Sequence, residues 1–176
     1  MTDRIPRRVF LGTTVLTLSV LGCGGKPRPD GMPELYPVRF IVTQEGTPLA
    51  DATVQFVPDG NSKWSTGGIT GADGSLIPNT HGEFPGIPLG KYRVIVTKIL
   101  KEGDPIPRTP MNEEEKKVWD AYWKSGNTEK QFNCVEKKYG GNDTPLTVEV
   151  TADSKEVPLD AGKITKDPIK VHKPNV

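Results

Sequence analysis

The sequence predicts an all-β protein, a β-sandwich of about seven strands with a short helical insertion. Two segments, residues 52–57 and 91–98, alternate apolar and polar side chains with a period of two, which is typical of half-buried strands. Glycine and proline account for 19 and 17 of the 176 residues, as expected for many turns between short strands. A chain of this length can bury one self-sufficient core, so we expect a single folded domain.

Residues 1–22 are expected to be a cleaved export signal. Arg4, Arg7 and Arg8 form a basic start, and residues 9–21 are apolar apart from threonine and serine. This apolar run is too short to cross a hydrocarbon core of about 30 Å as a helix. That favours a cleaved signal over a permanent anchor helix.

The apolar run closes with Val-Leu-Gly-Cys at residues 20–23, which resembles the bacterial lipobox. The resemblance implies cleavage between Gly22 and Cys23, a diacylglyceryl thioether on Cys23, and a further acyl chain such as palmitate on its amino group. An ordinary secretory signal with a chance cysteine, or a short anchor helix, is the alternative. Residues 7–11 (RRVFL) also resemble the twin-arginine export motif, which leaves export by that route or by the general secretory route open.

Residues 23–35 are rich in glycine and proline and are predicted to be a flexible spacer between lipid and domain. Loss of the leader removes three of the 23 basic and one of the 22 acidic residues, so the mature chain has a net charge near −1. Nucleic-acid binding demands a strong basic surplus. We therefore expect no nucleic-acid partner and little electrostatic attraction to a membrane.

The folded domain is predicted to span residues 36–160. Its first half should hold five strands, at 36–43, 52–57, 64–70, 75–77 and 91–98. Asp73-Gly74 predicts a tight hairpin turn between the third and the fourth of them. Gly67-Gly68 indicates a bulge or a close backbone contact, and residues 78–88 are expected to form a loop.

Three motifs in this half resemble those of carboxypeptidase-regulatory-like domains. They are GTPLADATV at 46–54, TGADG at 70–74 and LGKYRV at 89–94, and the similarity covers roughly residues 36–99 with a weaker return at 146–150. The resemblance implies a transthyretin-like, immunoglobulin-like sandwich of seven strands. Folds of this kind host many functions, so the resemblance predicts architecture rather than activity.

A helical insertion is expected at about residues 101–133. Three prolines predict a stiff loop, and Asn112, followed by acidic residues, predicts the start of a helix over 112–124. A late strand is expected near 146–151. Residues 156–159 could pair back on that strand as an edge interrupted by Pro158, and residues 161–176 are expected to be a loose C-terminal tail.

No catalytic set stands out from the sequence. His81 and His172 are the only histidines, too few for a histidine-based metal or acid–base site. Asp73, His81 and Glu83 could converge, but ordinary turn chemistry is the alternative. Two related folds are enzymes: hydroxyisourate hydrolase ends in Tyr-Arg-Gly-Ser, and intradiol dioxygenases hold iron with two tyrosines and two histidines. The chain matches neither requirement, so we expect no enzyme, no cofactor and no metal.

Aromatic side chains provide the one candidate ligand site. Trp119, Tyr122 and Trp123 lie on a broad stripe of the predicted helix. With Trp64 they could form a stacking platform for a sugar or a peptide. The alternative is that the helix lays these side chains onto the sandwich as a cap.

The expected function is non-enzymatic. The features predict a bacterial lipoprotein of the cell envelope, held in the cytoplasmic or outer membrane by acylated Cys23 and facing the periplasm or the exterior. It would be a binding or structural module for an envelope protein or a glycan. The alternatives are a carbohydrate-binding module that uses surface aromatics and a hydrolase of the transthyretin-related type. Cys134 is expected to be a buried free thiol, or to bridge Cys23 if Cys23 carries no lipid.

Overall fold

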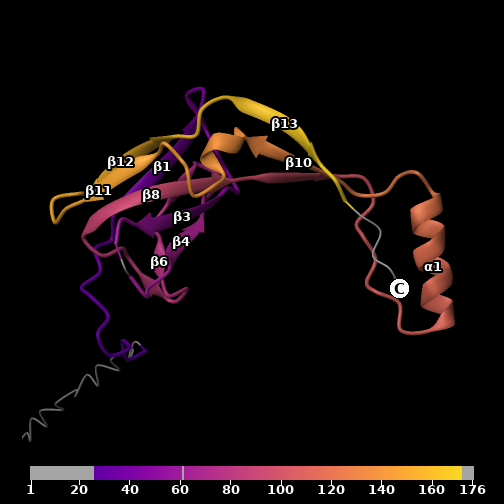
Figure 1. Cartoon of the computed structure of the whole chain (residues 1–176), viewed down its shortest axis with the longest axis horizontal. Helices are drawn as coiled ribbons and strands as arrows, with labels where there is room; N and C mark the ends of the chain where they lie inside the picture. The colour runs from indigo at the N-terminus through magenta and orange to yellow at the C-terminus, as the bar shows by residue number, and fades with distance from the viewer. Residues whose placement is uncertain (1–25, 61, 172–176) are drawn as a thin grey trace, which may run out of the picture.

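The computed structural model describes residues 26–60 and 62–171. Within them the chain forms thirteen strands, one α-helix and one short 3-10 helix (Figure 1). The strands make up three sheets, of six, four and three strands. The protein is therefore mostly β, as the sequence predicts. The expected leader with Gly22 and Cys23, together with His172, lies outside the described residues.

Two of the sheets form the sandwich. The larger has the order β11 (Thr147–Val150), β8 (Gly90–Thr97), β3 (Thr53–Pro58), β4 (Thr66–Ile69), β6 (Asn79–Thr80) and β7 (Phe84–Pro85). The smaller places β1 (Arg39–Gln44) between β12 (Glu156–Asp160) and β2 (Thr47–Pro48), and β1 also pairs with β5 (Ser75–Leu76). Many of these strands are very short, which is why their number exceeds the seven expected.

Alternate side chains of the main strands meet in one core between the two sheets. Phe40 on β1 and Phe56 on β3 pack with ring centroids 4.5 Å apart, and Tyr92 on β8 meets Phe56 edge-on at 6.3 Å. The core also includes Val42, Val54, Val94 and Val96 on these strands, and Val38 and Ala52 just before β1 and β3. The two-residue period thus identified the buried face of all three strands.

A glycine turn carries the chain from one sheet to the other. Gly74 has a φ of +73°, and a Cβ there would lie 2.5 Å from the carbonyl oxygen of Val42, so a larger residue cannot fit without a shift. The Asp73 carboxylate accepts the Ser75 N–H at 3.0 Å and closes the turn. The turn is where the sequence predicts it, but β5 pairs with β1 rather than with β4.

Residues 78–88 differ from the loop expected there. β6 and β7 form a small antiparallel hairpin around His81, whose φ is +55°. Thr80 is fully buried in this hairpin, where its hydroxyl donates to the Gly86 carbonyl and contacts the Thr66 hydroxyl. A buried threonine satisfied in this way carries no apolar signal, so the sequence pattern missed the two strands.

The late part of the chain also pairs differently from expectation. β12 runs parallel to β1, with Pro158 opposite Ile41, instead of pairing back on β11. Its expected place at a sheet edge is correct, and an edge position tolerates the missing N–H of proline. Leu159 faces the core.

The third sheet leaves the sandwich as an arm (Figure 1). We use this name for β9 (Ile99–Glu102), α1 (Glu113–Lys124), β10 (Lys130–Val135) and β13 (Ile164–Ile169), with their connections. β9 follows β8 after one residue, and β10 lies between β9 and β13. The expected insertion is therefore a β-ribbon with a helix at its end, and part of the expected loose tail is a strand of that ribbon.

Gln44 fixes the arm at its base. This side chain is 3% exposed, and its amide donates to the carbonyl oxygens of Cys134 at 3.0 Å and Lys163 at 3.2 Å. The Glu136 carboxylate accepts the Lys163 N–H at 3.0 Å. These contacts join the end of β1 to the start of β13 and to β10.

Candidate functional site

The helix that carries the predicted aromatic site begins as expected. The Asn112 side chain accepts the Glu115 N–H at 2.9 Å, and the first turn is acidic, which suits the positive end of the helix. However, α1 lies at the far end of the arm, away from the sandwich (Figure 1). The helix therefore does not cap the sandwich, which was the alternative interpretation of its aromatic residues.

The connection from β9 to α1 folds back along the helix and covers one side of it. The Tyr122 hydroxyl donates to the carbonyl oxygen of Asp104 at 3.0 Å. Nearer the helix start, the Glu115 carboxylate accepts the Met111 N–H at 2.8 Å and pairs with the Arg108 guanidinium. These contacts hold the proline-rich segment between β9 and α1 against the helix, near the start of the helix and near its end.

Trp119 lies on the helix face that is tied to this segment. Residues 115, 119 and 122 follow each other at spacings of four and three, so their side chains share one helix face. Glu115 and Tyr122 are both tied to the segment, and Trp119 between them is 2% exposed, while the neighbouring Val118 is 62% exposed. The Trp119 ring is consequently part of the packed interior of the arm tip and not an open platform.

The structure brings the three predicted platform residues together as a cluster. The Trp119 and Trp123 ring centroids are 5.9 Å apart, and those of Tyr122 and Trp123 are 5.2 Å apart. Among the described residues, neither buried indole N–H has a hydrogen-bond partner. Trp64 is not part of this cluster, since it precedes β4 in the sandwich and packs against His81.

Glu129 joins the arm tip to the arm sheet. Its side chain is 7% exposed, and its carboxylate accepts the Gln131 amide at 2.6 Å and pairs with Lys101 at 3.2 Å. The Gln131 amide, then the Lys101 ammonium and the Ile106 N–H, hold the pKa of Glu129 below its ordinary value. The Glu129 N–H donates to the Tyr122 hydroxyl at 2.7 Å, so the same residue also anchors the helix.

Acidification should loosen the arm tip through Glu129. A carboxyl with a lowered pKa in the folded state stabilises the fold above its ordinary pKa of about 4.3, and this contribution is lost as the pH falls through the folded-state pKa. We expect Glu129→Gln to lower the unfolding temperature of the tip at pH 7, measured by tryptophan fluorescence. The difference from the natural chain should shrink towards pH 3. Glu114→Gln, on an exposed part of α1, is the control, and a difference that stays constant with pH would contradict this role.

The predicted acidic residues and histidine of the turns each have separate partners. Asp73 pairs with Arg39 at 2.8 Å, and its pKa is lowered by the Ser75 N–H and hydroxyl and then by Arg39. Glu83 pairs with Lys26 at 2.9 Å. No group of three or more histidine, cysteine or carboxylate side chains in the described part of the chain is arranged to hold a metal ion. Turn chemistry and surface ion pairs account for these residues.

Cys134 is a half-buried free thiol whose sulfur lies 3.9 Å from the Phe132 carbonyl oxygen. The expectation of a buried thiol is therefore met only in part. None of the described helices is long and apolar enough to span a membrane.

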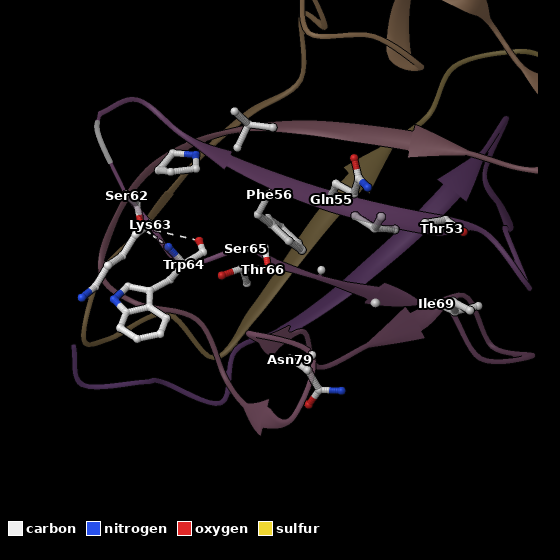
Figure 2. Close-up of a pocket in the computed structure, with 16 residues that line it drawn as sticks. Thr53, Gln55, Phe56, Ser62, Lys63, Trp64, Ser65, Thr66, Ile69 and Asn79 are labelled. Atoms are coloured by element: carbon white, nitrogen blue, oxygen red, sulfur yellow. Dashed lines mark hydrogen bonds between the residues drawn. The ribbon is translucent and has the colours of Figure 1, made fainter. Parts of the chain in front are cut away.

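A groove that the sequence analysis did not identify lies on the outer side of β3 and β4 (Figure 2). It has a volume of about 620 Å³. Trp64 stands at one end and Ile69 towards the other, with Gln55 on one side and Asn79 on the opposite side. The outward positions of the alternating strands were the available signal, but polar residues there resemble any solvated sheet face.

Comparison with family models, with curated proteins and with solved structures gives no match for this chain.

Proposed function

We propose that the protein is a lipid-anchored lipoprotein of the cell envelope, whose sandwich and arm act as a non-enzymatic binding or structural module. One observation carries the proposal: a basic start, an apolar run, a small residue and a cysteine coincide at residues 1–23. Cys23 would hold the membrane lipid, and the partner would be an envelope protein or a glycan. No catalytic residue is assigned.

The placement of the chain start supports a tethered module. The first described residues and α1 lie towards opposite ends of the long axis of the molecule (Figure 1). A lipid at Cys23, connected through the spacer at residues 23–35, would therefore attach at the end of the molecule away from the arm tip. Such an arrangement leaves the arm and the outer side of the sandwich accessible to a partner.

The proposed kinship with carboxypeptidase-regulatory-like domains is supported by where the three motifs fall. Gly46, with a φ of +78°, makes the turn between β1 and β2, and Gly74 makes the turn before β5. The third motif opens β8 and supplies the buried Tyr92. Each motif thus occupies a position where its glycine or apolar residue has a physical role.

Cys23→Ala tests the anchor. The variant should move from the membrane fraction to the soluble fraction and lose labelling by fatty-acid analogues. The physical reason is that each buried methylene contributes about 0.8 kcal/mol and two acyl chains make anchoring stable. Cys134→Ala, which removes the other cysteine, should stay in the membrane and keep the label. Retention of the Cys23→Ala chain in the membrane would refute the proposal.

A further inference from the structure

We propose that the groove on β3 and β4 binds a neutral saccharide chain. This inference deepens the proposed binding role and depends on that role, although it does not depend on lipidation of Cys23. The groove is defined by Gln55, Trp64, Gly67, Ile69 and Asn79 (Figure 2). Its volume of about 620 Å³ is in the range of small-molecule sites in proteins.

The floor of the groove is kept bare by glycine. Gly67 lies opposite Gln55 on β3 and opposite Asn79 on β6. A Cβ at Gly67 would lie 2.5 Å from the carbonyl oxygen of Val54, so a side chain cannot be added there without moving the backbone. The two amide side chains therefore flank a flat strip of sheet that a ligand can approach closely.

The walls combine one aromatic ring with free amides. The Lys63 ammonium lies 4.9 Å from the centroid of the Trp64 indole, and the His81 ring stands nearly perpendicular to it at 5.5 Å, so the indole is held in place. Gln55 and Asn79 are exposed. Neither amide makes a side-chain hydrogen bond with any described residue. Each amide can both donate and accept, as the hydroxyl groups of a sugar require.

The charge of the groove selects against other ligands. Among the described lining residues, Lys63 is the sole charged side chain and there is no carboxylate. A single cation is far from the basic surface that nucleic acid requires. Neutral hydroxyl groups suit this lining, because they bond with amides while the apolar face of a sugar ring packs on an indole.

Peptide addition to the sheet is disfavoured by the pairing of the strands. β3 lies between β8 and β4, and β4 lies between β3 and β6. β3 therefore has no free edge, and β6 leaves only Gly68 and Ile69 of β4 unpaired on that side, which is too short for an extended peptide to add as a strand. With strand addition disfavoured, the ligand is expected to lie across the face of the sheet and to bind through side-chain contacts. A saccharide chain is such a ligand.

The test uses the chain expressed with its leader and purified from whichever fraction retains it. Hexasaccharides of glucose, mannose, xylose and N-acetylglucosamine are the probes, offered at up to about 1 mM and titrated by calorimetry. We expect at least one to bind. Trp64→Ala should weaken that binding roughly thirtyfold or more, and Gln55→Ala and Asn79→Ala about two- to tenfold each.

One control variant and two further groove variants make the outcome decisive. Thr147→Ala, at an exposed position of β11 outside the groove, should leave the affinity unchanged. If Trp64→Ala fails to fold, the exposed Gln55 and Asn79 variants still test the site. Absence of binding to all four saccharides, or binding that none of the groove variants changes, would overturn the inference. Fractionation of Cys23→Ala tests the anchor separately, so a failed anchor and a failed groove are distinguished.

Discussion

Trp119→Ala is expected to unfold the tip of the arm while the sandwich stays folded. Truncation of a buried tryptophan costs about 3–5 kcal/mol. The tip has few other stabilising contacts, because a helix of twelve residues is marginal in isolation and Trp119 is the one buried residue of α1. Hydrogen exchange read by mass spectrometry should show lost protection over α1 and unchanged protection over β3 and β8.

Val118→Ala is the matched control for this experiment. Val118 is adjacent in sequence but 62% exposed, so its truncation should change stability by less than about 0.5 kcal/mol. If Trp119→Ala reduced the protection of the sandwich strands as much as that of the helix, the arm tip could not be an independent unit. The interpretation of Trp119 as internal packing would also fail if the variant kept full protection in α1.

Phe40→Ala is expected to destabilise the whole sandwich. Phe40 is fully buried and its ring packs on that of Phe56, so the pair joins the two sheets across the core. The expected loss is about 3–5 kcal/mol, a large share of the 5–15 kcal/mol that typically holds a domain together. Calorimetry should show a fall in Tm on the order of 10 °C.

Phe132→Ala is the control of the same residue type. Phe132 lies on β10 of the arm, is half-buried, and has the Lys166 ammonium 4.6 Å from its ring centroid. Its truncation should lower the Tm of the sandwich much less than Phe40→Ala does. Equal losses in the two variants would contradict a core confined to the two sandwich sheets.

The sandwich was predictable because its strands bury one face and expose the other. In β3 and β8, Val54, Phe56, Val94 and Val96 recur at every second position, and all four are buried. The helix start was equally visible, since Asn112 and the acidic residues after it have local roles that need no tertiary partner. Signals of this local kind survive in the sequence alone.

The insertion and its helix were expected, but the strands of the arm were missed because the arm sheet has almost no buried face. β13 is exposed at nearly every position, so no two-residue period marks it as a strand. The pairing of β12 with β1 is a contact between distant parts of the chain, which no local pattern specifies. Trp119 was assigned to the surface or to the sandwich, because the sequence does not reveal that the preceding proline-rich segment folds back along the helix.

The same distinction between local and distant signals applies to the aromatic cluster and to the groove. The spacing of the aromatic residues on the helix predicted a ligand platform, but in the structure these residues pack against one another within the tip. The groove depends on Gln55 and Asn79, which the chain brings together across β4 from strands about two dozen residues apart. Only the sheet register places these amides on either side of Gly67.

The most direct test of the tethered lipoprotein is the mass of its N-terminal peptide after extraction from the producing cells. We predict a peptide that begins at Cys23 and carries the diacylglyceryl group and an acyl chain, with residues 1–22 absent. A peptide that begins at another residue, or one with an unmodified Cys23, would contradict the account.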